Sequence, residues 1–183
     1  MRLRSVLLTL VMLAACSYAG AVTEVGEAPE IPETAVGGPS TIAIVDRQVL
    51  LDDAVDPEAV DLALMDAGFR IGAERVARDR QADVRETRVR VLRFADSAGA
   101  AAWLAYVDEH PVDVVGTATR GAPIGRAVVY HHVPDGCCPG KDLPSWWALS
   151  AGGTLVTVVV VRGPAVTRAD LVSAMATAGL PEE

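Results

Sequence analysis

Residues 87–104 read TRVRVLRFADSAGAAAWL and join a strand pattern directly to a helix pattern. Over the first half, Val89 and Val91 alternate with Arg88 and Arg90. Because successive side chains of a β-strand point to opposite faces, this alternation predicts a strand that is buried on one side and solvated on the other. The segment therefore places an amphipathic strand near the middle of the chain.

A helix is expected immediately after that strand. Asp96 offers a side-chain oxygen for the first unpaired N–H groups, and Pro111 should end the helix near His110. Between these signals, apolar residues recur at the spacing of one helical face: Ala100, Trp103, Leu104 and Val107.

The other patterns extend this order in both directions. A helix should begin at Asp56-Pro57 and end at Gly68, and a capping box of Thr167 and Asp170 should open the last helix. We expect strands over 42–51, 126–133, 146–151 and 154–162, and a helical piece over 71–80. Because hairpins alternate with helices, the predicted fold class is α+β, an antiparallel sheet with helices packed mainly on one face, in a single domain over residues 41–183.

The composition limits both the size of the fold and its partners. The chain has 183 residues, of which 51% are hydrophobic, so one domain with an ample core is expected and global disorder is excluded. Sixteen basic residues against 24 acidic ones give a net charge of −8. Because nucleic-acid binding needs a concentrated basic surface, nucleic acid is not expected among the partners.

The first residues carry the pattern of a secretory signal. Two arginines precede an apolar run over 6–15, which is too short for a membrane span of roughly 20 apolar residues. The run ends in LAAC at residues 13–16, which resembles the lipobox of bacterial lipoproteins. The resemblance implies a signal peptide of residues 1–15, lipid attachment to Cys16, and anchoring on the extracytoplasmic face of the cell membrane.

Ordinary secretion is the alternative. Ala19-Gly20-Ala21 has the small-residue pattern of a signal-peptide cleavage site, and cleavage after it would discard Cys16 and release the protein. In the lipidated form, residues 16–40 are expected to form a flexible acidic tether, because they contain three prolines and four glutamates without sustained periodicity.

A second resemblance rests on three features: the segment VLRFADSAGA at 91–100, Trp147 before a hairpin, and fifteen arginines against one lysine. In these features the domain resembles the small extracytoplasmic domains of actinobacterial lipoproteins, including those similar to the sensor domain of mycobacterial receptor kinases. The resemblance implies an extracytoplasmic α+β domain and assigns no catalytic residue.

The segment YHHVPDGCCP at 130–139 gathers two histidines and two cysteines, which are ligand types for zinc or copper. Neighbouring strand residues point to opposite faces, so His131 and His132 are not expected to reach one ion, and we assign no metal site. Outside the cytoplasm, Cys137 and Cys138 have only each other within the chain once Cys16 is lipidated. A strained vicinal disulfide is one expectation, and free thiols or a bridge to another chain are the alternatives.

Tryptophans and arginines are the candidates for ligand contact. Trp103 lies on the buried helical stripe, and one of Trp146 and Trp147 must face the sheet interior, which leaves the other as a candidate contact residue. A dense basic run comprises Arg85, Arg88, Arg90 and Arg93. This run either binds an anionic headgroup or polysaccharide, or forms a solvated face whose arginines pair with carboxylates.

No catalytic residue and no cofactor are expected, because the chain lacks the nucleophile-elbow, zinc-protease, P-loop and dinucleotide-binding motifs. The sequence favours a non-catalytic binding or sensing domain for a small molecule, a glycan or a protein. The alternatives are a structural envelope protein that docks a protein partner, and an enzyme without a recognised motif. A concave apolar pocket would favour the binding domain, and a flat apolar patch would favour the docking protein.

Overall fold

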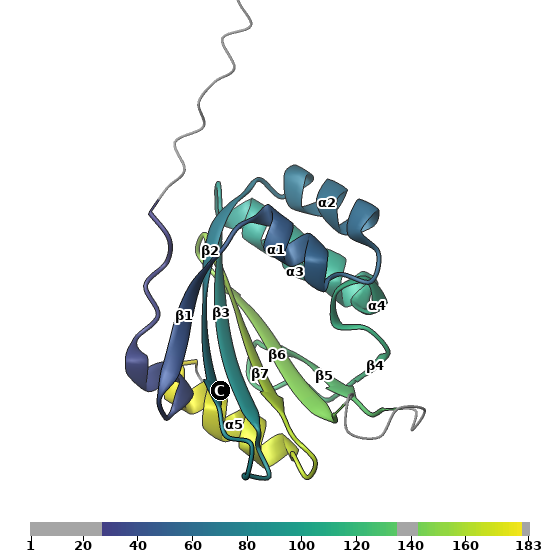
Figure 1. Ribbon diagram of the computed structural model, residues 1–183. Helices are drawn as coiled ribbons and strands as arrows, with labels where there is room; N and C mark the ends of the chain where they lie inside the picture. The colour runs from purple at the N-terminus through teal and green to yellow at the C-terminus, as the bar shows by residue number, and fades with distance from the viewer. Residues whose placement is uncertain (1–26, 135–142, 181–183) are drawn as a thin grey trace, which may run out of the picture.

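Seven strands form one antiparallel sheet in the computed structural model, which describes residues 27–134 and 143–180 (Figure 1). The strands are β1 (Ser40–Val45), β2 (Phe69–Arg78), β3 (Glu86–Phe94), β4 (Ala118–Arg120), β5 (Val128–His132), β6 (Ser145–Gly152) and β7 (Leu155–Arg162). Their order across the sheet is β1-β2-β3-β7-β6-β5-β4. The helices are η1 (Glu33–Val36), α1 (Arg47–Asp53), α2 (Pro57–Asp66), α3 (Ser97–Glu109), α4 (Pro111–Val115) and α5 (Arg168–Thr177).

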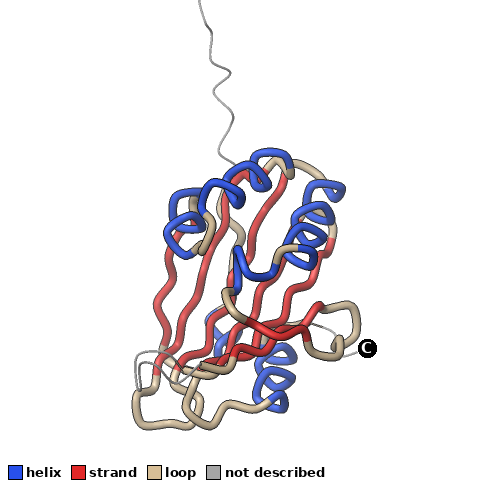
Figure 2. The backbone as a smooth tube through the Cα atoms, turned by 90° about the vertical axis from the view of Figure 1, so that its right-hand side faces the viewer, coloured by secondary structure: helices blue, strands red, loops and turns tan. Residues whose placement is uncertain are grey.

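The helices cover the two faces of the sheet unequally. Helices α1 to α4 gather over one end of one face, whereas α5 and η1 pack against the opposite face (Figures 1 and 2). Strand β3 serves both layers, since Val89 and Val91 face α5 while Leu92 and Phe94 face the other helices. The predicted α+β class with helices mainly on one face is thus confirmed. In the described part of the chain, no helix combines the length and apolar character needed to span a membrane.

Three helices begin where the sequence predicted them. The Asp56 carboxylate accepts from the Ala59 N–H at 3.1 Å, and the Asp96 carboxylate accepts from the Gly99 N–H at 2.8 Å. At the start of α5, the predicted capping box is formed, with Asp170 accepting from the Thr167 N–H at 2.7 Å. These side chains satisfy N–H groups that have no partner within the helix.

Two expectations about secondary structure are wrong, whereas the predicted end of the helix before Pro111 is confirmed. Residues 71–80 form most of β2 rather than a helical piece, because pairing with both β1 and β3 outweighs the helix propensity of Ala, Glu and Arg. The strand expected over 42–51 ends at Val45, because Asp46 caps α1 by accepting from the Val49 N–H at 3.0 Å. Pro111 follows the end of α3 as expected but is itself the first residue of α4.

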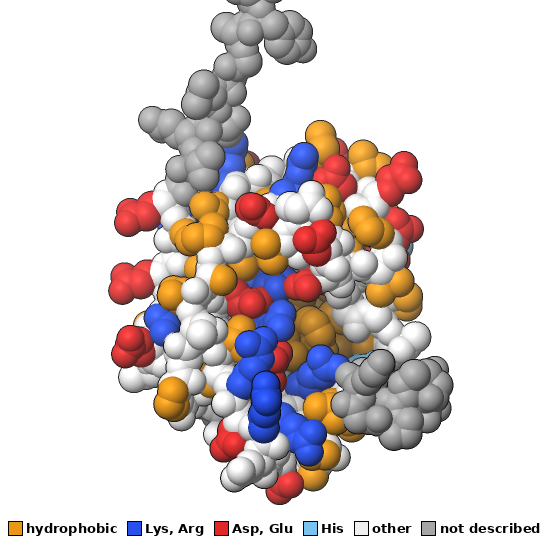
Figure 3. All heavy atoms as spheres, viewed as in Figure 1, with side chains coloured by type: hydrophobic (Ala, Val, Ile, Leu, Met, Phe, Trp, Pro, Cys, Tyr) orange, Lys and Arg blue, Asp and Glu red, His pale blue; other side chains and the backbone are white. Residues whose placement is uncertain are grey.

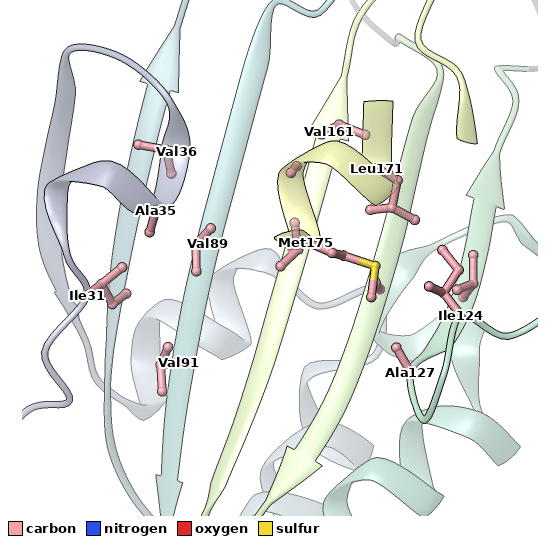
Figure 4. Close-up of a cluster of buried hydrophobic side chains, with 14 of the residues drawn as sticks. Ile31, Ala35, Val36, Val89, Val91, Ile124, Ala127, Val161, Leu171 and Met175 are labelled. Carbon is pink, nitrogen blue, oxygen red and sulfur yellow. The ribbon is translucent and has the colours of Figure 1, made fainter. Parts of the chain in front are cut away.

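The packed domain begins before the boundary expected at residue 41. Ile31, Ala35 and Val36 are each at most 6% exposed and pack on the α5 side of the sheet, near Val89 and Val91 (Figure 4). The flexible tether expected over 16–40 is therefore too long at its C-terminal end, since these apolar side chains fold η1 onto the sheet. The rest of that segment, up to residue 26, lies outside the described residues.

Arg75 fastens this N-terminal segment to β2, and its replacement by methionine should loosen it. The guanidinium is 9% exposed and donates from Nε to the Ile31 carbonyl at 3.0 Å and from Nη1 to Ser40 Oγ at 3.1 Å. Because the buried carbonyl loses a charged donor, Arg75→Met should lower the free energy of unfolding by about 2 kcal/mol in urea titrations. The exposed Arg70 on the same strand is the control, and Arg70→Met should change stability by less than about 0.5 kcal/mol. Equal urea midpoints for the two variants would contradict this role for Arg75.

Candidate binding cavity

Strand pairing places one polar row across the face of the sheet that α1 to α4 cover. Glu86 of β3 lies opposite Arg162 of β7. On its other side, Arg162 lies opposite Ser145 of β6, which in turn lies opposite His132 of β5. Directly paired residues point to the same face, so the four side chains form a continuous row, and all four line one cavity.

The next two rows are apolar in the middle and basic at the β3 end. In sheet order they read Arg88-Val160-Trp147 and Arg90-Val158-Leu149. All six of these residues line the same cavity. The sheet therefore presents an apolar floor with polar side chains along two of its borders, the β3 edge and the row of Glu86.

Helices α1 to α4 close the opposite side of the cavity and supply mainly apolar groups. Leu50 comes from α1, Val60 from α2, Trp103 from α3 and Val115 from α4. The enclosed volume is about 510 Å³, and 14 of the 23 lining residues are apolar. Figure 3 shows the hollow beside the arginine side chains that gather on this face. Both size and lining are those of small-molecule binding sites in proteins.

Two arginines at the edge of the cavity share their carboxylate partners. Arg90 donates from Nε and Nη2 to Glu74 Oε2 at 2.9 and 2.6 Å, and Arg88 reaches the same oxygen from Nη1 at 3.2 Å. Asp53, the last residue of α1, lies 2.6 Å from Arg90 Nη2 and 3.8 Å from Arg88 Nη1. The two arginines and Glu74 are held in the sheet, whereas the Asp53 side chain is 50% exposed. The expected pairing of the basic run with carboxylates is thus confirmed for Arg88 and Arg90.

Hydrogen bonds position Trp147 and one side chain of the polar row, His132. The indole Nε1 of Trp147 donates to Ser145 Oγ at 2.9 Å, which orients the ring over the floor of the cavity. His132 Nδ1 lies 2.8 Å from the Thr117 carbonyl, so Nδ1 carries the proton and links β5 to the loop after α4. The polar groups are therefore positioned before any ligand is bound.

The two tryptophans of β6 lie on opposite faces of the sheet. Trp147 lines the cavity, whereas Trp146 stacks on His131 on the α5 side, with ring centroids 4.1 Å apart. Both side chains are half-buried, and Trp103 is buried in the core, as predicted. His131 and His132 also point to opposite faces, as expected. Between the two candidates, it is Trp147 that the fold directs into a cavity.

Three predicted site residues lie outside the part of the chain that the structure describes: Cys16, Cys137 and Cys138. The lipid on Cys16 and the vicinal disulfide therefore stay predictions. Within the described residues, no three His, Cys, Asp or Glu side chains gather as a metal site would require.

Two tyrosines with raised pKa values lie outside the cavity lining. Burial, together with a 2.9 Å hydrogen bond to Asp113, raises the pKa of Tyr106 to about 12. Burial also raises the pKa of Tyr130, whose hydroxyl donates to Asp108 at 2.9 Å. Both hydroxyls are protonated donors at neutral pH and connect α3 to its neighbours.

The carboxylates that complete the site, Glu74 and Asp53, were not among the predicted site residues. Glu74 lies in the segment predicted as helical, and Asp53 lies two residues beyond the strand expected over 42–51, so nothing placed them beside Arg90. The alternation of Arg88 and Arg90 with valines indicated only that the two arginines share one face of the strand. Their burial, and with it their need for carboxylate partners, is a property of the folded chain.

Comparisons with known proteins found one structural similarity to report. No family model matches the chain, and no curated protein matches it. The extracellular domain of PknH from Mycobacterium tuberculosis is similar at 13% sequence identity and a TM-score of 0.43, over 76% of this chain and 75% of that one. At this level of similarity, the function has to rest on the cavity itself.

Proposed function

We propose that the chain is a non-catalytic binding domain, anchored by a lipid on Cys16 to the extracytoplasmic face of the cell membrane, and that the cavity between the sheet and α1 to α4 holds its ligand. The observation that carries the proposal is the cavity of about 510 Å³, with its apolar floor and fixed polar border. A concave apolar pocket with a few convergent polar groups is the usual form of a small-molecule site.

The two alternatives have less support in the described residues. Tyr106 and Tyr130, whose pKa values are raised, lie outside the cavity, so neither of them supports catalysis in it. A protein-docking surface would need a broad apolar patch. The exposed large hydrophobic side chains of the described residues are spread over several elements: Ile42 and Ile44 on β1, Leu62 and Met65 on α2, Val112 on α4, Val55 before α2 and Val133 after β5.

Binding of Nile red, a neutral apolar dye, tests the cavity without testing charge recognition. The protein for this test is expressed directly as residues 16–183, without the predicted signal peptide. Cys16→Ser removes the predicted site of lipid attachment, so no detergent is needed. We expect the dye to bind and its fluorescence to rise. Because Trp147 is the largest aromatic contact on the floor, Trp147→Ala should weaken dye binding by about thirtyfold, the effect of removing an anchor tryptophan.

Trp146 provides a matched control on the same strand. Trp146→Ala removes an equally large, half-buried ring from the opposite face and should leave dye binding unchanged. Val158→Phe, which extends a side chain into the cavity from the floor, should also weaken binding. Equal losses in the two tryptophan variants, or no effect of Val158→Phe, would place the dye elsewhere and refute the proposed site.

A further inference from the structure

Arginine and carboxylate side chains gather on the cavity-facing side of the sheet. The cavity is lined from β3 and β7 by Arg88, Arg90 and Arg162, and Arg78 of β2 lies beside them. Three carboxylates accompany them, namely Asp53, Glu74 and Glu86. Arg88 and Arg90 share their carboxylate partners and border the apolar floor, so they are the groups that an anionic ligand would contact.

Asp53 is the carboxylate that a ligand would replace. Glu74 and Glu86 have side chains only 14% and 16% exposed within the sheet, whereas that of Asp53 is 50% exposed and lines the cavity. Asp53 is also the last residue of α1, where the negative end of the helix dipole disfavours a carboxylate. The anionic group of a ligand would replace the Asp53 carboxylate as the negative charge beside Arg90. The Asp53 side chain would then be free to turn away from the negative end of the α1 dipole.

The apolar floor begins directly beside these two arginines. In each of the two rows, the residue next to the arginine is a valine, followed by Trp147 or Leu149. A molecule with its anionic group at Arg88 and Arg90 would therefore extend its body across Val158 and Val160. No residue on that path carries a charge.

We propose that the cavity binds an amphipathic anion, a single apolar chain or body with a carboxylate or phosphate at one end. The anionic group takes the place of Asp53 on Arg88 and Arg90, and the apolar part lies along Val158, Val160 and Trp147. This inference rests on the proposed function and adds the chemical class of the ligand. Guanidinium groups favour such anions because their N–H donors match the oxygens in pairs.

Four probes with simple chains test this class by isothermal titration calorimetry, each below the concentration at which it forms micelles. Decanoate should bind about tenfold more tightly than decanol, because only decanoate makes charge-assisted hydrogen bonds to the arginines. Decyltrimethylammonium, with the same chain and the opposite charge, should bind more weakly than decanol. Octanoate should bind about fifteenfold more weakly than decanoate, since each buried methylene contributes about a fourfold gain in affinity.

Three variants separate the arginine site from general changes in the protein. In the double replacement Arg88→Gln with Arg90→Gln, decanoate and decanol should bind with equal affinity. Asp53→Asn should tighten decanoate by about fivefold, a gain that misfolding cannot produce. Arg93→Gln is the matched control, because Arg93 lies on the same strand with its side chain on the opposite face. It should leave all affinities unchanged.

The outcomes distinguish this inference from the function on which it rests. Equal affinity for decanoate and decanol, or a preference for decyltrimethylammonium, would overturn anion recognition while Nile red binding still supported the cavity. An unchanged or weaker decanoate affinity in Asp53→Asn would overturn the exchange of carboxylates. Failure of all the probes and of Nile red to bind would overturn both proposals.

Discussion

Replacing Cys16 by serine should abolish lipid attachment completely and leave the precursor uncut. The thiol is the group that forms a thioether with the lipid, and the hydroxyl of serine does not replace it in this reaction. Metabolic labelling with a palmitate analogue should therefore mark the wild-type chain and give no signal in Cys16→Ser. Mass spectrometry of the variant should show residues 1–15 still attached. Two acyl chains give stable membrane attachment, so the wild-type chain should partition into detergent.

The other cysteines supply matched controls for this experiment. Cys137→Ser and Cys138→Ser make the same chemical change outside the LAAC motif, and both should keep full labelling and normal processing. A wild-type chain that carried no label and began at Val22 would show cleavage after Ala21 instead. That result would refute the anchor and leave the binding cavity as a property of a released protein.

Local signals were sufficient for three helix starts, each made by a side chain that acts within one turn of its own position. Asp56, Asp96 and Thr167 each lie a few residues from the N–H groups that they satisfy, so their helices were correctly predicted. The alternation of β3 also reports a local fact, since it separates the face that packs on α5 from the face that carries Arg88 and Arg90. The second face is not solvated as predicted, because α1 to α4 cover part of it. The α+β class followed from the order of these elements.

The strand β2 was missed because distant pairing decides its local conformation. Residues 71–80 contain good helix formers, but hydrogen bonding to β1 and β3 on both sides makes them a strand. At Gly72, an added Cβ would lie 2.8 Å from Leu92 Cδ2 and 2.9 Å from the Val91 carbonyl oxygen. This close strand-to-strand approach explains the glycine, and nothing in its immediate sequence indicates it.

The cavity could be predicted only in fragments, for the same reason. Arg88, Arg90 and Trp147 were identified as candidates from their own segments. The row that joins Glu86 to His132 exists because β7 inserts between β3 and β6, a pairing of segments far apart in the chain. Asp53 reaches Arg90 only because α1 folds over the sheet. Recognition of the complete site therefore depends on the register between strands, which local periodicity does not contain.

Gly99→Ala should destabilise the domain by about 3 kcal/mol, the upper part of the range for overpacked sites. Gly99 lies in the first turn of α3, where alanine would ordinarily raise helix stability by about 1 kcal/mol. Here a Cβ would overlap the carbonyl oxygen of Ala67 and lie 3.1 Å from the carbonyl carbon. These are backbone atoms at the end of α2, so relief requires that α2 and α3 move apart. The clash therefore reverses the sign that helix propensity alone would give.

Gly152 supplies the control for this substitution, because an added Cβ there meets no atom within 4 Å and its φ is not in the left-handed region. Gly152→Ala should change the free energy of unfolding by less than about 0.5 kcal/mol in urea titrations. Separation of α2 from α3 would also displace Val60 and Trp103, which line the cavity, so Gly99→Ala should weaken Nile red binding while Gly152→Ala should not. If Gly99→Ala were as stable as the wild type and bound the dye equally well, α2 and α3 would not be in the close contact on which the cavity depends.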